Sequence, residues 1–189
     1  MPADPHNPSV TEFFDQATST LSYVVADTES KVCAIIDPVL ELDESSAEVT
    51  TWGANQIIEH LRTNELSCKY ILETHAHADH LSAGFYLKKR LSVPIGIGQG
   101  IVDVQHVFGE MYYETLSFKR DGSQFDLLLT DGHILPLGRF AIRPMHVPGH
   151  TPACMAYRVG NAVFVGDTLF MPDLGTARCD FPGGNASAL

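Results

Sequence analysis

The chain alternates between short apolar runs and polar turns. Residues 20–27 and 31–37 are rich in β-branched side chains and flank a short polar turn, which predicts a β-hairpin. After Pro38 we expect a polar, acidic loop, and apolar side chains at helical spacing in residues 52–62 predict a helix. Residues 68–73 then form a short predicted strand.

The second half of the chain is richer in strands. A helix is expected at residues 80–91, a strand at 93–97 and a short helix at 101–108, followed by a polar loop. The remaining apolar runs are predicted strands, at residues 125–129, 134–137, 140–146, 154–159 and 162–165. Gly160-Asn161 between the last two is a strong hairpin signal. This order predicts a layered α/β protein with largely antiparallel hairpins, and 189 residues fit one domain, 1–189.

Composition and charge narrow the classes of function. Hydrophobic residues make up 44% and charged residues 19%, close to a soluble globular average, and no apolar run approaches the ~20 residues that span a bilayer. The formal net charge is −11 with no basic stripe to offset it, so we expect no nucleic acid and no membrane as partners. The N-terminus shows no secretory signal and the four cysteines are scattered, so we expect reduced thiols and a cytoplasmic protein.

Histidines are concentrated next to one predicted strand. This strand is followed at once by residues 74–80, THAHADH. In an extended chain, residues two apart face the same side, so His75, His77 and Asp79 can converge, and His80 falls where the next helix is expected to begin. Imidazole and carboxylate donors at this spacing are what a divalent metal needs. The alternative is a polar loop whose histidines cap the helix and bond to the backbone.

Two segments downstream offer further donors. His150 follows a Pro-Gly turn, and Asp167 lies at the end of a predicted strand. Each has a simpler alternative, with His150 as a satisfied turn residue and Asp167 as the N-cap of a helix. Together with residues 74–80 they supply the distant ligands that a metal site assembled from several loops requires. For His146, close to His150, we expect a structural role.

Three motifs, in this order, resemble those of the metallo-β-lactamase superfamily: H-x-H-x-D-H at residues 75–80, G-H-T at 149–151 and G-D-T at 166–168. The resemblance covers about residues 13–184 and implies an α/β fold, the metallo-β-lactamase-type αβ/βα sandwich with its metal site at one edge. Family members continue with further helices and strands, including a last histidine for a two-metal site. We therefore expect a sandwich whose C-terminal part is missing, and the uncovered apolar surface favours a homodimer or aggregation.

Within the superfamily, residues 73–80, 146–152 and 175–181 are most similar to the persulfide dioxygenases, close to bacterial proteins called β-lactamase-like hydrolases. The resemblance implies a non-haem Fe(II) persulfide dioxygenase. Such an enzyme oxidises glutathione persulfide to glutathione and sulfite in sulfide detoxification, so its expected partners are a small-molecule thiol persulfide and O2.

The resemblance also implies one Fe(II) per chain, held by His75, His150 and Asp167. Two imidazoles and one carboxylate form a facial triad, which leaves three positions open for substrate and oxygen. Arg178 is the candidate for gripping a carboxylate of a glutathione-like substrate, because a guanidinium suits bidentate pairing. A structural contact between Arg178 and Asp180 explains this arginine equally well.

The other residues of the first motif leave the identity of the metal open. In an iron enzyme His77, Asp79 and His80 orient ligands and hold water, and we expect Asp79 and His80 to be catalytic. In the zinc hydrolases of the superfamily these three residues bind metal directly, His77 at the first metal and Asp79 and His80 at the second. The second hypothesis is therefore a Zn(II)-dependent thioester or lactone hydrolase of the glyoxalase II type. A third is an inactive remnant that binds metal without turnover.

Overall fold

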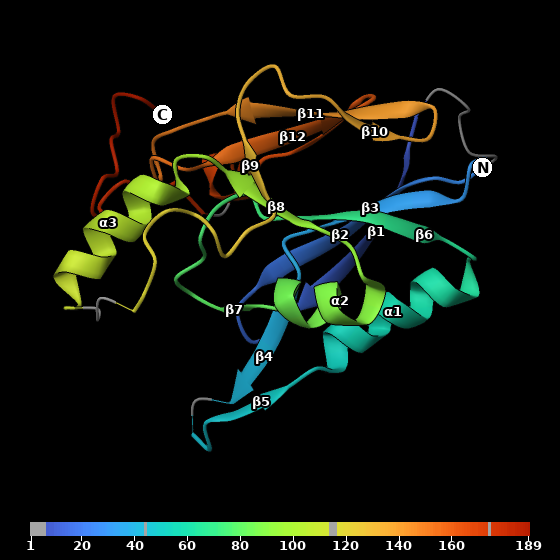
Figure 1. Ribbon diagram of the computed structural model, residues 1–189, viewed down its shortest axis with the longest axis horizontal. Coiled ribbons are helices and arrows are strands. Elements are labelled where there is room, and N and C mark those ends of the chain that lie inside the picture. Colours follow the sequence, from blue (N-terminus) through green and yellow to red (C-terminus); the bar gives the residue numbers. More distant parts are fainter. Residues whose placement is uncertain (1–6, 44, 114–116, 174) are drawn as a thin grey trace.

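The computed structural model describes residues 7–43, 45–113, 117–173 and 175–189. These ranges leave out most of the N-terminal stretch in which no secretory signal was found. They also leave out part of the polar loop predicted after residue 108. Figure 1 shows the described residues in layers, with the helices α1 (Trp52–Thr63) and α2 (Gly84–Leu91) below a central sheet and a second sheet above it. This is the layered α/β arrangement that the sequence predicts.

The central sheet contains six strands in the order β1-β2-β3-β6-β8-β9. Their bounds are β1 (Ser9–Asp15), β2 (Thr20–Asp27), β3 (Val32–Ile36), β6 (Ser67–Leu72), β8 (Ile95–Gly98) and β9 (Leu127–Leu129). The predicted β2–β3 hairpin is confirmed, and β1 pairs with β2 although its half-exposed pattern gave no prediction. From β3 to β9 the pairing is parallel, so the expectation of largely antiparallel hairpins is wrong for this sheet. Helical crossovers connect these strands, as parallel pairing requires.

Three helices lie in the described residues: α1 (Trp52–Thr63), α2 (Gly84–Leu91) and α3 (Ile101–Met111). The predicted start of α2 at His80 is wrong by four residues. Leu81 and Ser82 form the short strand β7 (Leu81–Ser82), which pairs with β4, and the Ser82 hydroxyl then accepts a hydrogen bond from the Gly84 N–H. Among these helices none is long and apolar enough to cross a membrane.

The polar, acidic loop predicted after Pro38 is instead a second hairpin. It consists of β4 (Val39–Asp43) and β5 (Glu48–Thr50), which form a small sheet with β7. Strong exposure of β5 explains why its sequence lacks an apolar run. Pairing of β4 with β7 is important for the site, because it fixes the chain directly after the H-x-H-x-D-H motif.

The second sheet has the order β10-β11-β12-β13 and is antiparallel throughout. Its strands are β10 (Leu135–Leu137), β11 (Phe140–His146), β12 (Met155–Val159) and β13 (Ala162–Phe164). The Gly160-Asn161 hairpin is confirmed. In the described part of the chain, no helix covers the outer face of this sheet (Figure 1).

A hydrophobic core joins the two sheets. It includes the fully buried side chains of Ile36, Leu72 and Tyr157. Gly98 of β8 packs closely against the loop before β12, since an added Cβ would lie 2.4 Å from the Ala153 carbonyl oxygen. Close contact at this point brings the loops at the ends of both sheets together. All four cysteines are unpaired, as expected.

Candidate metal centre

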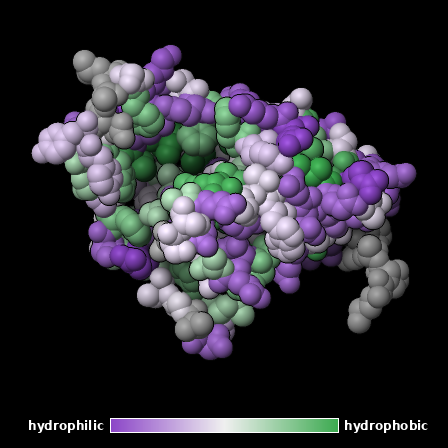
Figure 2. Space-filling model, turned by 90° about the horizontal axis from the view of Figure 1, so that it is seen from below, coloured by the Kyte–Doolittle hydropathy of each residue, from purple (hydrophilic) through white to green (hydrophobic). Residues whose placement is uncertain are grey.

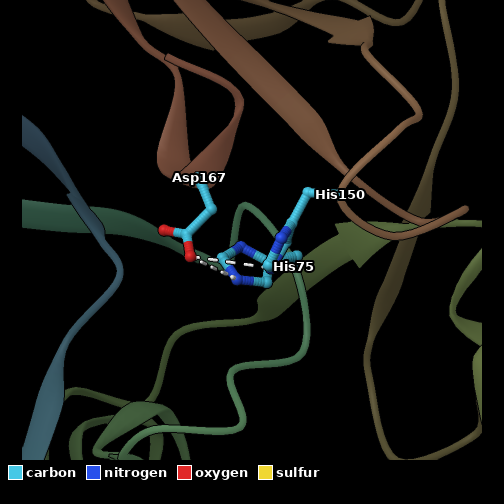
Figure 3. Close-up of side chains that lie close together, drawn as sticks. All are labelled: His75, His150 and Asp167. Atoms are coloured by element: carbon cyan, nitrogen blue, oxygen red, sulfur yellow. Dashed lines mark ion pairs between the residues drawn. The ribbon is translucent and has the colours of Figure 1, made fainter. Parts of the chain in front are cut away.

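Three loops at one edge of the sandwich supply the predicted ligands. His75 follows β6, His150 lies between β11 and β12, and Asp167 lies in a short 3-10 turn (Gly166–Thr168) after β13. Because β6 and β13 belong to different sheets, the site forms only when the sheets pack. In Figure 3 the three side chains point toward one another.

The geometry of this group suits a divalent ion. Asp167 Oδ2 lies 3.9 Å from His75 Nε2 and 3.6 Å from His150 Nε2. Ligand atoms of the three residues all lie within 4.8 Å of one another. Atoms bound at about 2.1 Å to one ion can be up to about 4.2 Å apart, so a small rotation of the side chains would complete the coordination.

Hydrogen bonds fix which ring nitrogen of each histidine is available. His150 Nδ1 lies 2.7 Å from the main-chain carbonyl oxygen of Arg178, an acceptor, so Nδ1 carries the proton. Thr74 Oγ1 donates to Asp37 and lies 3.0 Å from His75 Nδ1, which can donate to it in turn. Burial lowers the pKa of His75 to about 3, so its imidazole is neutral near pH 7. In both rings Nε2 therefore keeps its lone pair for a metal.

His77 belongs to a different environment from His75. Its Nε2 faces two buried carboxylates, Asp37 at 3.2 Å and Glu73 at 3.6 Å. Burial disfavours the charged ring, but the Asp37 carboxylate outweighs it and raises the pKa of His77 to about 11. Burial also raises the pKa of Glu73. His77 thus lies between two carboxyl groups that favour its charged form.

The end of the motif forms a second possible metal group. Ligand atoms of His77, Asp79 and His80 lie within 4.8 Å of one another. His80 Nδ1 lies 3.2 Å from the Leu81 carbonyl oxygen, and its buried Nε2 has no hydrogen-bond partner in the described part of the chain. A buried nitrogen with a free lone pair is what a metal or a bound water would satisfy.

The expected extended geometry of residues 74–80 is wrong. The segment bends instead of continuing β6, and the His77 ring lies 4.1 Å from that of His75 and 4.2 Å from that of His80, centroid to centroid. As a result His75 joins His150 and Asp167, whereas Asp79 joins His77 and His80. The residues do meet, but in two groups rather than along one face of a strand.

Arg178 pairs with Asp180 through two hydrogen bonds of 2.8 and 3.1 Å, and its side chain is 62% exposed. The structure thus shows the contact between Arg178 and Asp180 that was the structural alternative for this arginine. The main-chain carbonyl group of Arg178 also holds the ring of His150, and the sequence did not indicate this role. His146 lies outside both metal groups and bonds to the Pro152 carbonyl oxygen, in line with its predicted structural role.

Sequence reasoning missed two buried carboxylates, Asp37 and Glu73. Both directly follow strands, β3 and β6, that are parallel neighbours. Carboxyl ends of parallel strands meet at one edge of a sheet, so recognising this pairing would have placed both beside the histidines. Their charged side chains directly after apolar strands were the available signal.

A cavity adjoins the histidines on the helix side. It has a volume of about 530 Å³. Its lining combines His75, His77 and His80 with apolar side chains that include Phe85 and Ile97. Figure 2 views the molecule from this side and shows a hollow bordered by apolar residues. The metal groups thus lie beside a space large enough for a small molecule.

Solved structures share this fold. ETHE1 from Myxococcus xanthus matches with a TM-score of 0.72, covering 95% of this chain and 65% of that one at 24% sequence identity. A protein solved in a di-iron-bound form matches with a TM-score of 0.62, covering 94% of this chain and 81% of that one at 23% identity. At such identities the likeness establishes the fold, which is the predicted metallo-β-lactamase type.

Curated relatives carry two kinds of name. A probable metallo-hydrolase of Burkholderia pseudomallei is 51% identical over 191 residues, which are 96% of this chain and 65% of that protein. The mitochondrial persulfide dioxygenase ETHE1 of Homo sapiens is 31% identical over 180 residues, 94% of this chain and 58% of that protein. This chain therefore spans less than two thirds of the length of either relative.

The family model described as the metallo-beta-lactamase superfamily matches residues 16–189. That range includes all three motifs and all residues of the possible metal groups. The His and Asp groups at the sheet edge are candidates to hold a metal ion. This chain belongs to the metallo-beta-lactamase superfamily.

Proposed function

We propose that this chain is the metal-binding part of a non-haem Fe(II) persulfide dioxygenase, with one Fe(II) per chain, that oxidises glutathione persulfide to glutathione and sulfite. The observation that carries the proposal is the group formed by His75, His150 and Asp167. Two buried imidazoles and one carboxylate converge there, and such a triad leaves three positions open. Similarity to the human persulfide dioxygenase supports the choice of substrate.

Bound Fe(II) would supply redox-active positions where a persulfide sulfur and O2 can react side by side. In the overall reaction O2 accepts the four electrons lost by the outer sulfur, and water supplies the third oxygen of sulfite. The protein's own contribution is orientation. His75 and His150 are held by Thr74 and by the Arg178 carbonyl group, so both can present Nε2 to a metal.

Asp79 and His80 are the proposed catalytic residues beside this triad. His80 Nε2 is buried and unpaired in the described part of the chain, so it can hold a water or accept a proton. The adjoining cavity of about 530 Å³ gives the thiol persulfide and O2 room to approach.

Arg178 would bind a substrate carboxylate by exchanging its exposed partner Asp180 for the substrate. A homodimer is also proposed, since Leu169 and Met171 are exposed.

The second candidate is a Zn(II)-dependent hydrolase of a thioester or lactone. It is favoured by a specific observation, the second group of His77, Asp79 and His80, whose ligand atoms also lie within 4.8 Å of one another. Similarity to a probable metallo-hydrolase supports it as well. In this case the chain's carboxylates and imidazoles would hold the water that attacks the carbonyl carbon.

Oxygen uptake by the Fe(II)-loaded protein, with and without glutathione persulfide, tests the proposal. We expect persulfide-dependent uptake with sulfite as the product, and none from a matched Asp167→Ala variant. No uptake from a folded sample that contains iron would contradict the dioxygenase, and hydrolysis of a thioester by the zinc-loaded protein would then establish the second candidate. Metal binding with neither activity would identify an inactive remnant.

A further inference from the structure

We propose that Cys33 and Cys68 are a redox-sensitive pair, which a hydroperoxide converts into a disulfide within the folded protein. Cys33 lies in β3 and Cys68 in β6. The two residues are direct partners in the register of these parallel strands. Neither belongs to a possible metal group, so the inference depends on neither the metal nor the substrate.

The geometry of the pair suits a disulfide. Both side chains lie in the same hydrophobic cluster as Ile57 and Leu61 of α1, so they occupy the same face of the sheet. Neighbouring strands are about 4.8 Å apart, and Cα atoms of disulfide-linked cysteines are usually about 4.4–6.8 Å apart. The thiols also interact directly, because the Cys68 thiol, followed by burial, raises the pKa of Cys33. The two sulfur atoms therefore need little movement to form a bond.

An irregularity in the strand pairing gives the backbone room to adjust. Cys33 pairs with Cys68 and Ala34 pairs with Tyr70, so Lys69 is an extra residue on β6. The Cys68 thiol donates a hydrogen bond to the Tyr70 carbonyl oxygen across this point, at 3.3 Å. A bulge interrupts the regular ladder of main-chain hydrogen bonds. Movement of Cys68 toward Cys33 therefore disturbs fewer hydrogen bonds than it would in a regular strand.

Exposure of the two thiols sets the order of the reaction. Cys68 is 9% exposed, near the start of β6, whereas Cys33 is fully buried. A molecule as small as hydrogen peroxide therefore reaches Cys68 first. The Cys68 sulfur loses its proton and attacks one peroxide oxygen, and the O–O bond breaks. The proton goes to the leaving hydroxide, so a sulfenic acid and one water form.

Cys33 completes the reaction as the resolving thiol. Its sulfur attacks the sulfur of the Cys68 sulfenic acid, and its proton goes to the leaving hydroxide. A disulfide and a second water form. The two thiols together lose two electrons and two protons, and one peroxide is reduced to two waters. Hydroperoxide is therefore the only co-reactant that this step needs.

Peptide mapping by mass spectrometry tests this inference. The folded, metal-free protein is treated with hydrogen peroxide, unfolded in a thiol-blocking reagent and digested with trypsin. Cleavage after Lys31, Arg62 and Lys69 gives peptides 32–62 and 63–69, each with one cysteine. We expect these peptides to be joined, two hydrogen atoms lighter than the reduced pair, and to separate on treatment with dithiothreitol. Oxidation of the exposed Met171 shows that the peroxide dose was sufficient.

Single substitutions test the order of the two steps. Cys33→Ser should leave Cys68 as a sulfenic acid that dimedone traps, because its neighbouring thiol is gone. Cys68→Ser should leave Cys33 as a thiol, because Cys33 is fully buried. Cys179→Ser is the matched control. It removes a thiol that lies outside both strands, and peptides 32–62 and 63–69 should still be joined.

Blocked thiols in both peptides of a folded sample whose Met171 is oxidised would overturn the inference. A link from Cys33 or Cys68 to Cys154 or Cys179 would overturn it as well. The unsubstituted protein carries this test, so the result stands even where a variant fails to fold. A failure of the dioxygenase proposal is seen separately, as absent persulfide-dependent oxygen uptake.

Discussion

Neighbouring histidines of one motif differ because their surroundings differ. Burial keeps His75 neutral next to a hydroxyl group, whereas His77 is buried next to two carboxylates that favour its charged form. Spacing alone cannot distinguish them, since each is a histidine two residues from the next donor. The partners come from positions directly after β3 and directly after β6.

Alanine substitutions within the motifs test the assignment of the ligands. His75→Ala, His150→Ala and Asp167→Ala should each abolish Fe(II) binding, because each removes one of three bonds to the ion. The loss should exceed the about 10–100-fold cost of losing an outer hydrogen bond. His77→Ala serves as the control and should leave iron bound. Anaerobic equilibrium dialysis measures all four, and loss of iron from His77→Ala would favour zinc-type coordination.

Secondary-structure elements were predictable where a local apolar pattern marks them, and not where they depend on pairing with a distant strand. The pattern of apolar residues predicted the β2–β3 hairpin, α1 and the four strands of the second sheet to within a few residues. It failed at β4 and β5, whose exposed side chains give no apolar run, and at the start of α2, which depends on the pairing of β7 with β4. Such pairings join residues about 40 positions apart and leave no local signal.

Tyr157→Phe tests the bond between the sheets at the ligand loop. Tyr157 is fully buried, and its hydroxyl donates to the Glu73 carbonyl oxygen at 2.7 Å. We expect the free energy of unfolding to fall by about 1–3 kcal/mol, because a buried carbonyl group would lose its partner. Urea denaturation measures the change. Tyr86→Phe, which loses an exposed hydrogen bond to Asn55, should cost clearly less, and equal losses would contradict this explanation.

Asp27 connects the β2–β3 hairpin to the β10–β11 turn. It is fully buried and accepts hydrogen bonds from the side chain and N–H of Arg139. The Arg139 guanidinium holds the pKa of Asp27 well below its usual range. A carboxyl group with a lowered pKa stabilises the folded state fully above its unfolded pKa of about 4, and this stabilisation is lost as the pH falls through the folded pKa.

We therefore expect the free energy of unfolding to decrease below about pH 4, and Asp27→Asn to remove part of that decrease. At neutral pH the substitution should cost about 2 kcal/mol, less than for a fully buried pair because the Arg139 side chain is 38% exposed. Urea denaturation at several pH values measures both effects. Glu59→Gln, which removes a carboxylate from an exposed ion pair, is the control. If the stability of Asp27→Asn depended on pH as that of the unsubstituted protein does, Asp27 would not be the group responsible.

For the whole molecule, the metal site is a product of the packing between the two sheets. His75 belongs to the end of the central sheet, whereas His150 and Asp167 belong to the second sheet. An ion that bridges them binds the folded state only, so it adds to the stability of the packed sandwich.

Metal should accordingly raise the melting temperature. At a free Fe(II) or Zn(II) concentration of about 100 times Kd, the free energy of unfolding should rise by about 2.7 kcal/mol, and a chelator should reverse this increase. Thermal unfolding with and without metal measures this gain. The Asp167→Ala variant should show a much smaller shift, and an equal shift in that variant would indicate that the metal binds elsewhere.

Motifs are local, so the residues that could carry chemistry and the superfamily of the chain were recognisable from residue types, spacing and order. This holds for the residues of all three motifs: His75, His77, Asp79, His80, His150 and Asp167. How these residues are grouped, and which histidine is neutral, depends instead on the folded chain. Protonation and ligand geometry depend on burial and on partners such as Asp37, Glu73 and the Arg178 carbonyl group, which the packing of distant strands brings to the site.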